Sequence, residues 1–440
     1  MLPPLTNLDS TFEHQFAETL RYCKEHIPFY RDVWRDLDPI VRFTDTPTFN
    51  KADLRRRHAD FLNRKLATRH ILHTSGTTGD PLLILRSAEE VDFINDVFPA
   101  LHHEQPASSR RLGLSIRDNV HGFGPAYRGD TLWVGDPSFT PPTLALAEQY
   151  LLRRFNLPAC EERITSIFMS VLEVLHFSEF VYRRGLDVAR TEINTIYTTG
   201  FPSCPTWNEI IVRRWRCRHI NVFSLAEVFG QALSCDRCGA YHWDPFSVVE
   251  FLQPDTLLPV ENGLARLVIT TLYPYTQLMP LVRYDTGDLV VVNRDCPSGP
   301  GFIPLGRRDN AQRLSDGTLH PFDSEILEAL STCHWIKRIK PFSLEKLALP
   351  GTEAFGMPEV GIRTSPSGSE TVITLTPAEN TDPPSRDEVD KITVRLRGAC
   401  RQSLSKAQKV GEVVNLRVEV GSIQAKSKSI FGCATAGIPQ

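Results

Sequence analysis

The sequence predicts an α/β protein with a large N-terminal domain followed by a small α+β domain. Its length of 440 residues exceeds what one ordinary hydrophobic core accommodates. Helical and extended patterns alternate as far as Phe223, which is typical of a sheet covered by helices. Beyond Asp309 the chain starts a second alternation of helix and strand. We therefore expect one domain at residues 1–309 and another at 310–440.

Each expected element follows from its hydrophobic period. Apolar residues recur at helical spacing in residues 11–27 and 162–184, and Pro28 and Gly185 end these two segments. The large domain should also contain an extended run at 193–198, a helix at 208–218 and strands at 220–223, 248–252, 265–272 and 289–293. In the small domain we expect a helix at 325–330, a strand at 371–375, a long helix at 386–404 and a strand at 414–420.

The composition argues against nucleic acid and membrane as partners of this protein. A hydrophobic content of 41% and a charged content of 23% are typical of a globular protein. The formal net charge of −3 offers no basic face for nucleic acid, and no apolar run approaches the length of a membrane span. Charged residues interrupt the N-terminal segment, so no signal peptide is expected. We expect a cytoplasmic protein whose partner is a small molecule, with neither nucleic acid nor membrane involved.

The segment from His73 to Leu82 alternates glycines with hydroxyl residues just before an apolar run. Glycine lacks a side chain, so backbone N–H groups can approach an anion, and hydroxyls add donors around phosphate oxygens. No Walker-A pattern accompanies the segment, which excludes a P-loop NTPase. The pattern indicates a phosphate-binding turn, with a flexible surface loop as the alternative. The residues of this turn are Ser75, Gly76, Thr77, Thr78 and Gly79.

A second pattern has the spacing of a metal site. Cys235 and Cys238 are followed by His242, and Cys296 comes from a later turn. Three thiolates and an imidazole suit tetrahedral Zn²⁺, and a site closed by four protein ligands is structural rather than catalytic. Cysteines in a reducing compartment are more often free thiols or metal ligands than disulfides. The alternative is therefore a group of unpaired thiols.

Further motifs follow one another along the chain. They are Ile27–Arg31, Pro47–Arg55, Tyr197–Pro202, Phe223–Glu227, Pro280–Leu289 and Gly306–Asn310. Together with the glycine–hydroxyl turn, they resemble the acyl-adenylate-forming superfamily, and in particular its phenylacetate–coenzyme A ligase branch. The run from Pro280 to Leu289 is the strongest single match. Members of this branch include proteins with a Cys/His cluster at the two places noted above, and the strands after Cys238 resemble the barrel-like part of the family's large domain.

The resemblance implies an AMP-forming ligase that uses ATP and Mg²⁺. Such an enzyme activates an aromatic carboxylic acid to an acyl-adenylate, and its small mobile domain rotates before the acyl group passes to coenzyme A. Asp309 stands at the position of the family's hinge. The alternatives are a nitrogen acceptor, nitrite as the activated species, or a nucleotide-binding relative without turnover. A homodimer is one candidate assembly.

The resemblance also assigns roles to residues. The residues implied to bind the nucleotide are Ser75, Gly76, Thr77, Thr78, Gly79, Gly200, Phe201, Pro202, Phe223, Ser224, Asp288 and Arg307. The residues implied to be catalytic are Thr77, Glu227 and Lys428, with Lys426 as the second choice of lysine. In these roles Glu227 helps to hold Mg²⁺, Asp288 accepts from both ribose hydroxyls, and Arg307 approaches the ribose or the α-phosphate.

The acid substrate is expected to lie against aromatic side chains. The candidate residues are Phe123, Tyr127, Tyr197 and Ser224, with Phe201 and Phe223 as further aromatic faces. Core packing is the alternative for several of these rings. Arg117 and His121 are candidates to pair with the carboxylate or with a ring substituent.

The chain departs from the family pattern at several positions. Asp80 stands where a lysine often follows the second glycine, and Phe223 replaces the usual tyrosine-glycine pair. Neither Lys428 nor Lys426 follows a glycine. Residues 312–317 also differ from the compact basic turn that helps to line the pantetheine tunnel, so coenzyme A as the acceptor rests on the resemblance alone.

Overall fold

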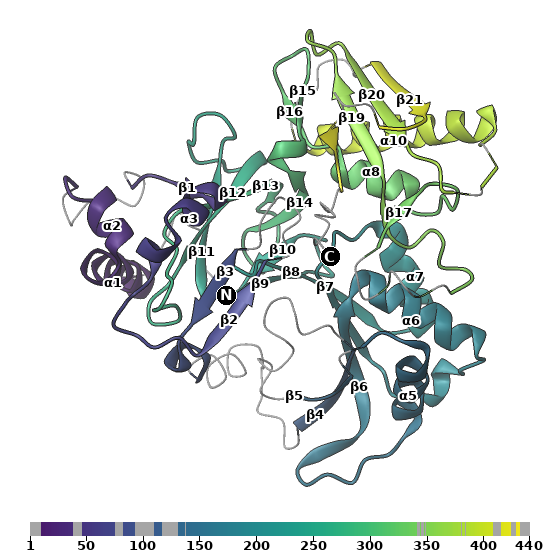
Figure 1. Ribbon diagram of the computed structural model, residues 1–440, viewed down its shortest axis with the longest axis horizontal. Helices are drawn as coiled ribbons and strands as arrows, with labels where there is room; N and C mark the ends of the chain where they lie inside the picture. The colour runs from purple at the N-terminus through teal and green to yellow at the C-terminus, as the bar shows by residue number, and fades with distance from the viewer. Residues whose placement is uncertain are drawn as a thin grey trace, which may run out of the picture.

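The computed structural model describes residues 10–37, 46–74, 82–92, 110–116, 131–136, 138–340, 344, 347, 349–379, 381–382, 384–407, 415–423 and 428–431. Figure 1 shows a mixed α/β architecture in which a large sheet runs through the middle of the molecule. The N-terminal helices lie on one side of this sheet, a second group of helices lies on the other, and the C-terminal elements lie together at the top of the view.

One sheet of 12 strands organises the larger part of the chain, in the order β11-β12-β13-β14-β10-β9-β8-β7-β6-β4-β5. Its parallel part consists of β4 (Arg110–Ile116), β5 (Thr131–Asp136), β6 (Cys160–Ser170), β7 (Thr195–Thr199) and β8 (Arg218–Ser224). Its antiparallel part consists of β9 (Gln231–Ser234), β10 (Tyr241–Trp243), β11 (Ser247–Leu252), β12 (Gly263–Thr271), β13 (Tyr284–Asn293) and β14 (Gly301–Arg307). The short strand β1 (Phe49–Asn50) runs parallel to the start of β13.

Three helices pack on the parallel part of the sheet: α5 (Pro141–Leu152), α6 (Val171–Arg183) and α7 (Pro205–Trp215). Their apolar side chains form one buried cluster with the strands. A short 3₁₀ turn at η4 (Val188–Arg190) precedes β7. The layers are those of an α/β protein, as the sequence predicts.

The expected helix at 162–184 is wrong in its first half, because those residues belong to β6. Strand β6 lies between β4 and β7 and is buried on both faces near its end, so its apolar residues do not alternate with polar ones. Such a run has no clear period of two. The helix begins only at Val171, where Ser170 and Glu173 form a reciprocal capping box.

The N-terminal elements cover the antiparallel part of the sheet. They are α1 (Ser10–His26), α2 (Pro28–Val33), α3 (Lys51–Arg56), the 3₁₀ turn η2 (His58–Phe61) and the hairpin of β2 (His70–His73) with β3 (Leu83–Arg86). Asn50 caps α3 by accepting hydrogen bonds from the backbone N–H groups of Ala52 (2.8 Å) and Asp53 (3.2 Å). Lys51 is therefore the first residue of a helix whose start is fixed beside β13.

The C-terminal part contains a four-stranded sheet in the order β21-β20-β19-β22. Its strands are β19 (Val360–Thr364), β20 (Glu370–Leu375), β21 (Asn415–Val420) and β22 (Lys428–Ser429), and its helices are α8 (Asp323–Leu330) and α10 (Arg386–Ala407). Short ladders pair β15 (Gln312–Arg313) with β16 (Leu319–His320) and β17 (Arg338–Ile339) with β18 (Met357–Pro358).

A separate buried cluster supports this part and contains residues only from Leu314 onward. The link from β14 is the 3₁₀ turn η5 (Arg308–Asn310), in which Asp309 is exposed. Helix α8 also contributes Leu327 to the cluster around α5, α6 and α7. A domain boundary directly after Asp309 remains a prediction.

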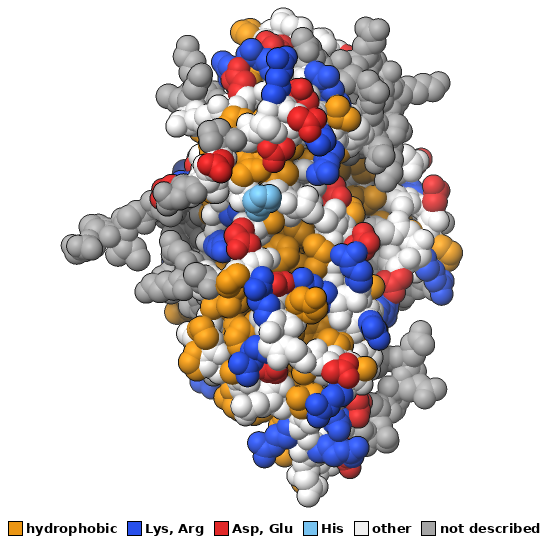
Figure 2. All heavy atoms as spheres, turned by 90° about the vertical axis from the view of Figure 1, so that its right-hand side faces the viewer, with side chains coloured by type: hydrophobic (Ala, Val, Ile, Leu, Met, Phe, Trp, Pro, Cys, Tyr) orange, Lys and Arg blue, Asp and Glu red, His pale blue; other side chains and the backbone are white. Residues whose placement is uncertain are grey.

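On the face shown in Figure 2, the described Lys and Arg side chains are interspersed with Asp and Glu. Among the described residues, none of the helices has the combined length and apolar character needed to span a bilayer.

Candidate functional site

The first part of the site is formed by neighbouring strands of the antiparallel sheet. Asp288 on β13 pairs in register with Arg307 at the end of β14, and the Arg307 Nη1 lies 2.9 Å from the Asp288 Oδ1. Arg307 also donates to the carbonyl of Thr286 at 2.8 Å. Among the described residues, the Asp288 Oδ2 is buried and has no hydrogen-bond partner. The site therefore offers one carboxylate oxygen that is held in place and one that remains available as an acceptor.

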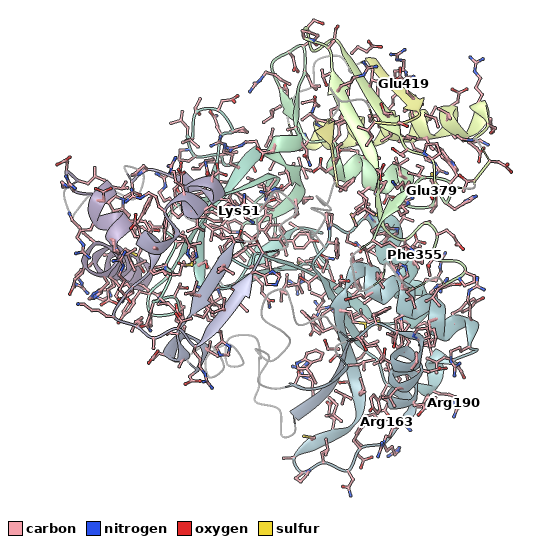
Figure 3. The ribbon with its side chains drawn as sticks, in the orientation of Figure 1. Lys51, Arg163, Arg190, Phe355, Glu379 and Glu419 are labelled. Carbon is pink, nitrogen blue, oxygen red and sulfur yellow. The ribbon has the colours of Figure 1, made fainter. Side chains whose placement is uncertain are left out.

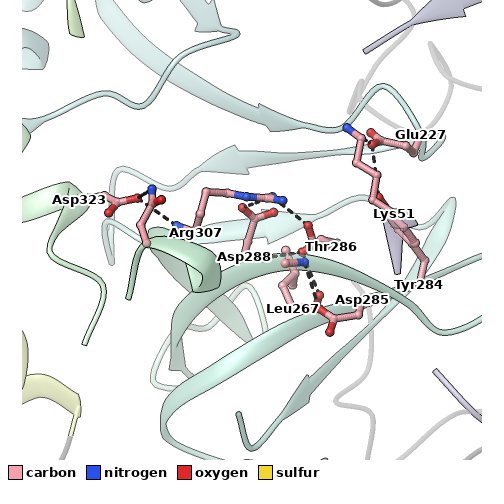
Figure 4. A network of polar contacts seen from close by, with 11 residues as sticks. Lys51, Glu227, Leu267, Tyr284, Asp285, Thr286, Asp288, Arg307 and Asp323 are labelled. Atoms are coloured by element: carbon pink, nitrogen blue, oxygen red, sulfur yellow. Dashed lines mark hydrogen bonds and ion pairs between the residues drawn. The ribbon is translucent and has the colours of Figure 1, made fainter. Parts of the chain in front are cut away.

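Asp323, at the start of α8, holds the backbone of this pair from the other side. Its Oδ2 accepts hydrogen bonds from the Arg307 N–H at 3.0 Å and from the Asn310 Nδ2 at 3.1 Å. The carboxylate of Asp288 raises the pKa of Arg307 above its usual range, and burial raises the pKa of Asp323 to about 6. These contacts join β13, β14 and α8 in one polar network (Figure 4).

Glu227 forms the second part of the site, in the turn after β8. Its Oε1 lies 2.9 Å from the Lys51 Nζ and accepts a hydrogen bond of 3.3 Å from the Tyr284 hydroxyl. The Glu227 side chain is 7% exposed and that of Lys51 is 23% exposed, so the ion pair is partly withdrawn from water. Burial also raises the pKa of Tyr284 well above its usual value, which keeps its hydroxyl a donor.

The sequence did not predict Lys51 as a site residue. The parallel pairing of β1 with β13 places Phe49 opposite Tyr284 and Asn50 opposite Asp285, so Lys51 follows directly beside the site. In Figure 3, Lys51 lies where the N-terminal helices face the central strands. The capping pattern Asn50-Lys51-Ala52-Asp53 is the local signal that could have located this residue at a helix start.

The two parts of the site both include residues of β13, which contributes Tyr284 to one part and Asp288 to the other. The strand is irregular between them, because Asp285 pairs with Val268 and Leu289 pairs with Arg266, which leaves the residues from Thr286 to Asp288 in a bulge. The carboxylate of Asp288, and to a smaller extent that of Glu227, raises the pKa of Arg307, which links the two parts of the site electrostatically.

The buried carboxylate of Asp285 stabilises β13 and the turn that follows β14. The Asp285 Oδ2 lies 2.9 Å from the Arg308 Nη1 and 3.3 Å from the Arg266 Nη1. Its Oδ1 accepts the Gly287 N–H at 3.0 Å. Gly287 has a φ of +78°, a conformation that suits glycine, and the Arg307 guanidinium occupies the space beside it. A side chain at residue 287 would displace the guanidinium.

The middle motifs lie at the ends of β7 and β8. The Thr199 Oγ1 lies 3.3 Å from the Ser224 Oγ, and Ser224 is exposed. Tyr197 is two residues before Thr199 and therefore faces the same side of β7. Gly200 follows with a φ of +84°, ahead of Phe201 and Pro202. The motif thus places two hydroxyls and one aromatic side chain on one face.

Two of the aromatic candidates pack in the interior. The Phe223 ring meets the Phe302 ring edge-on at 5.4 Å between centroids, and it also contacts Tyr241 and Trp243. Phe201 is half-buried against the cluster of α5, α6 and α7. These contacts favour the core-packing alternative for both rings.

Several candidates lie outside the described residues: Ser75, Gly76, Thr77, Thr78, Gly79, Asp80, Arg117, His121, Phe123, Tyr127 and Lys426. The two ends of the glycine–hydroxyl turn are described and lie together. Thr74 N–H donates to the Leu82 carbonyl at 3.0 Å, and Leu82 N–H donates to the Thr74 Oγ1 at 3.1 Å. The backbone of Lys428 pairs with Ile362 in the β22–β19 ladder, and its side chain is outside the described set.

The cysteine and histidine pattern does come together in space. The ligand atoms of Cys235, Cys238, His242 and Cys296 all lie within 4.8 Å of one another. The His242 Nδ1 lies 3.2 Å from the Pro300 carbonyl, which favours a proton on Nδ1 and leaves Nε2 free to bind a metal. Three sulfurs and one ring nitrogen are a donor set that fits tetrahedral Zn²⁺.

Comparisons with known proteins give the fold. No protein-family model and no curated protein matches the sequence. A crystal structure of 2-hydroxyisobutyryl-CoA ligase in an open conformation, in complex with 2-HIB-AMP and CoA, is similar with a TM-score of 0.68 and 16% identity, covering 97% of this chain and 90% of that chain. The same ligase in the thioesterification state has a TM-score of 0.61, with 16% identity over 97% of this chain and 90% of that chain. The amide bond synthetase McbA from Marinactinospora thermotolerans has a TM-score of 0.50 and 15% identity, over 80% of this chain and 65% of that chain.

The chain therefore has the mixed α/β fold of the 2-hydroxyisobutyryl-CoA ligase structures, and this fold extends over nearly its whole length. The fold class predicted from the sequence is confirmed. The phenylacetate–coenzyme A ligase branch stays a prediction.

Proposed function

We propose that the protein is an AMP-forming ligase that activates a carboxylic acid with MgATP and transfers the acyl group to coenzyme A. The observation that carries this proposal is the pairing of Asp288 with Arg307, because it leaves one buried carboxylate oxygen without a partner among the described residues, on the strand whose Tyr284 donates to Glu227. A fixed carboxylate is suited to the vicinal hydroxyls of a ribose. The fold supports the proposal, since one similar structure is a CoA ligase in complex with 2-HIB-AMP and CoA.

In this proposal Asp288 binds the ribose, and Arg307 orients Asp288 or approaches the α-phosphate. Glu227 is the residue that fits Mg²⁺, because a carboxylate is a hard oxygen ligand and sits at the phosphate end of the site. Lys51 neutralises Glu227 and is proposed to contact the phosphates of the same nucleotide. The turn at Ser75–Gly79 is proposed to surround the β- and γ-phosphates, with Thr77 among its donors.

The chemistry then follows two substitutions. A carboxylate oxygen attacks the α-phosphorus, the bond to the bridging oxygen of the β-phosphate breaks, and pyrophosphate leaves with that electron pair. Lys428, or Lys426, is proposed to stabilise the charge on the α-phosphate. A thiolate of coenzyme A next attacks the acyl carbon, and AMP leaves as the mixed-anhydride bond breaks. Rotation of residues 310–440 about Asp309 is proposed to separate the two steps.

We propose an aromatic acid as the substrate and Tyr197, Ser224, Phe123 and Tyr127 as the residues around it. The support from the described residues is that Tyr197 and Thr199 share one side of β7, where the Thr199 hydroxyl lies 3.3 Å from the Ser224 hydroxyl. A nitrogen acceptor in place of coenzyme A is the second candidate, because one similar structure is an amide bond synthetase. We further propose a cytoplasmic location and a structural zinc held by Cys235, Cys238, His242 and Cys296.

The test is product analysis. Purified protein is incubated with MgATP, coenzyme A and a panel of aryl, arylalkyl and small aliphatic hydroxy acids, and products are identified by mass spectrometry. We expect AMP, pyrophosphate and an acyl thioester with at least one acid. Formation of ADP, or folded protein that releases no AMP with any acid and with either coenzyme A or an amine, would falsify the proposal.

A further inference from the structure

We propose that Arg86 is a positioning residue that fixes Glu227 and joins it to the hairpin that carries the glycine–hydroxyl turn. This inference rests on the proposed function, because it gives Arg86 a role in holding the Mg²⁺ ligand. Arg86 is not part of any motif in the sequence analysis.

Arg86 is unusual in being a fully buried arginine, with 0% of its surface exposed. Its Nη2 donates a hydrogen bond of 2.9 Å to the backbone carbonyl of Glu227. Its guanidinium carbon lies 5.4 Å from the centre of the Phe229 ring, within the range of a cation–π contact. One side chain therefore contacts both residue 227 and residue 229.

The turn that carries Glu227 needs such a support. Residues 225–230 follow the end of β8 and precede β9, so they have no strand pairing. Among the described backbone groups, the bond within this turn is Val228 N–H to the Leu225 carbonyl at 3.2 Å. A hydrogen bond from a buried guanidinium to the Glu227 carbonyl fixes the plane of that peptide, and hence the direction in which the side chain leaves the backbone.

Arg86 also belongs to the β2–β3 hairpin, whose two strands lie on either side of the glycine–hydroxyl turn in the sequence. Arg86 is the last residue of β3 and pairs with His70, and the same hairpin closes at Thr74 and Leu82 on either side of the glycine–hydroxyl turn. Through Arg86, the position of the Glu227 carbonyl is therefore tied to the β2–β3 hairpin.

A purely structural role would not need this residue type. An apolar side chain fills a buried volume without the cost of taking a charged group out of water. A guanidinium can donate a hydrogen bond to the Glu227 carbonyl, and an apolar side chain cannot. The experiment must therefore separate the geometry of Glu227 from the stability of the fold.

The test compares Arg86→Met, Arg86→Lys and the matched control Arg69→Met, since Arg69 lies on the same hairpin with an exposed side chain. Titration calorimetry measures ATP affinity as a function of Mg²⁺, and AMP affinity without Mg²⁺. For Arg86→Met we expect the Mg²⁺ requirement for ATP binding to rise about five-fold or more while AMP affinity changes less than about two-fold, because only the metal end of the site is disturbed. Arg86→Lys, which keeps a cation, should be intermediate, and Arg69→Met should match the wild type.

A double-mutant cycle gives the deciding result. If Arg86 acts through Glu227, then Arg86→Met in a Glu227→Gln background should cause no further loss of Mg²⁺-dependent ATP binding. Additive losses, or AMP affinity and unfolding temperature that fall in parallel with ATP affinity, would overturn the inference. Should Arg86→Met fail to fold, the same cycle is run with Arg86→Lys. Nucleotide binding is measured without any acid, so a failure of the inference is distinguishable from a failure to find an acid substrate.

Discussion

Arg307 and Asp288 face each other across the β13–β14 ladder, and their side chains form an ion pair of 2.9 Å that leaves the second Asp288 oxygen buried and without a partner among the described residues. A buried acceptor without a donor is costly, so such a group is expected to meet a ligand. We expect this ligand to be the ribose of ATP.

Asp288→Ala should weaken ATP binding about 10- to 100-fold, because a hydrogen bond to a charged group contributes about 1.5–3 kcal/mol. Wild-type protein should lose a similar factor when ATP is replaced by 2′,3′-dideoxy-ATP, whereas the variant should bind both nucleotides equally. Calorimetry with the two nucleotides measures this. A variant that still distinguishes them would assign the ribose to another residue.

Lys51→Met should lower the rate of adenylate formation about ten-fold, since it removes the cation that contacts Glu227 at the proposed phosphate end of the site. AMP binding should be little changed, because AMP lacks the β- and γ-phosphates. Lys65→Met, which changes an exposed lysine of the same N-terminal part, is the control. Equal rates for Lys51→Met and the control would show that Lys51 only balances the charge of Glu227.

The pH dependence of stability should reveal Asp323. Burial raises its pKa to about 6, so the folded state binds a proton more tightly than the unfolded chain, whose aspartates titrate near 3.9. The contribution of Asp323 to stability is therefore most favourable below about pH 4 and declines as pH rises to about 6, by about 3 kcal/mol.

Asp323→Asn keeps an oxygen to accept from Arg307 and Asn310 but does not ionise, so it should remove this decline and be more stable than wild type near pH 7. Urea unfolding from pH 4 to 8 measures the effect. Asp316→Asn, at an exposed position, is the control. Parallel pH profiles for the wild type and Asp323→Asn would refute the burial argument.

The cysteine cluster predicts about one zinc per chain by elemental analysis. Cys296→Ser and Cys238→Ser should each lower the zinc content and the unfolding temperature, because the metal joins the β9–β10 hairpin to the turn after β13. Cys160→Ser, which changes a half-buried cysteine outside the cluster, should leave the zinc content unchanged. A zinc content below about half an equivalent in the wild type would contradict a structural site.

The sequence located the residues that lie in contiguous motifs. Asp288 and Arg307 belong to two specific sequence motifs, and the structure brings the two residues together. The cysteine and histidine spacing likewise predicted a cluster that the described residues form. In each case the local pattern contained enough information to identify residues that the structure brings together.

Contacts between distant segments were not predictable in the same way. Lys51 reaches Glu227 through a parallel pairing of only two residues of β1 with β13, and so short a strand has no hydrophobic period. Arg86 is the last residue of β3, and the other residues of that strand are all apolar. The sequence therefore gives no sign that Arg86 is buried beside Glu227, because its burial depends on how the hairpin packs. The helix predicted from residue 162 failed for a related reason, because a strand buried on both faces has no period of two.

Acid-dependent exchange of radiolabelled pyrophosphate into ATP tests adenylation most directly, because it needs no second acceptor. We expect exchange with at least one carboxylic acid, its loss in Glu227→Gln, and a reduced rate in Asp288→Ala at subsaturating ATP. No exchange with any acid, from folded protein that binds MgATP, would contradict adenylation and leave a nucleotide-binding protein without turnover.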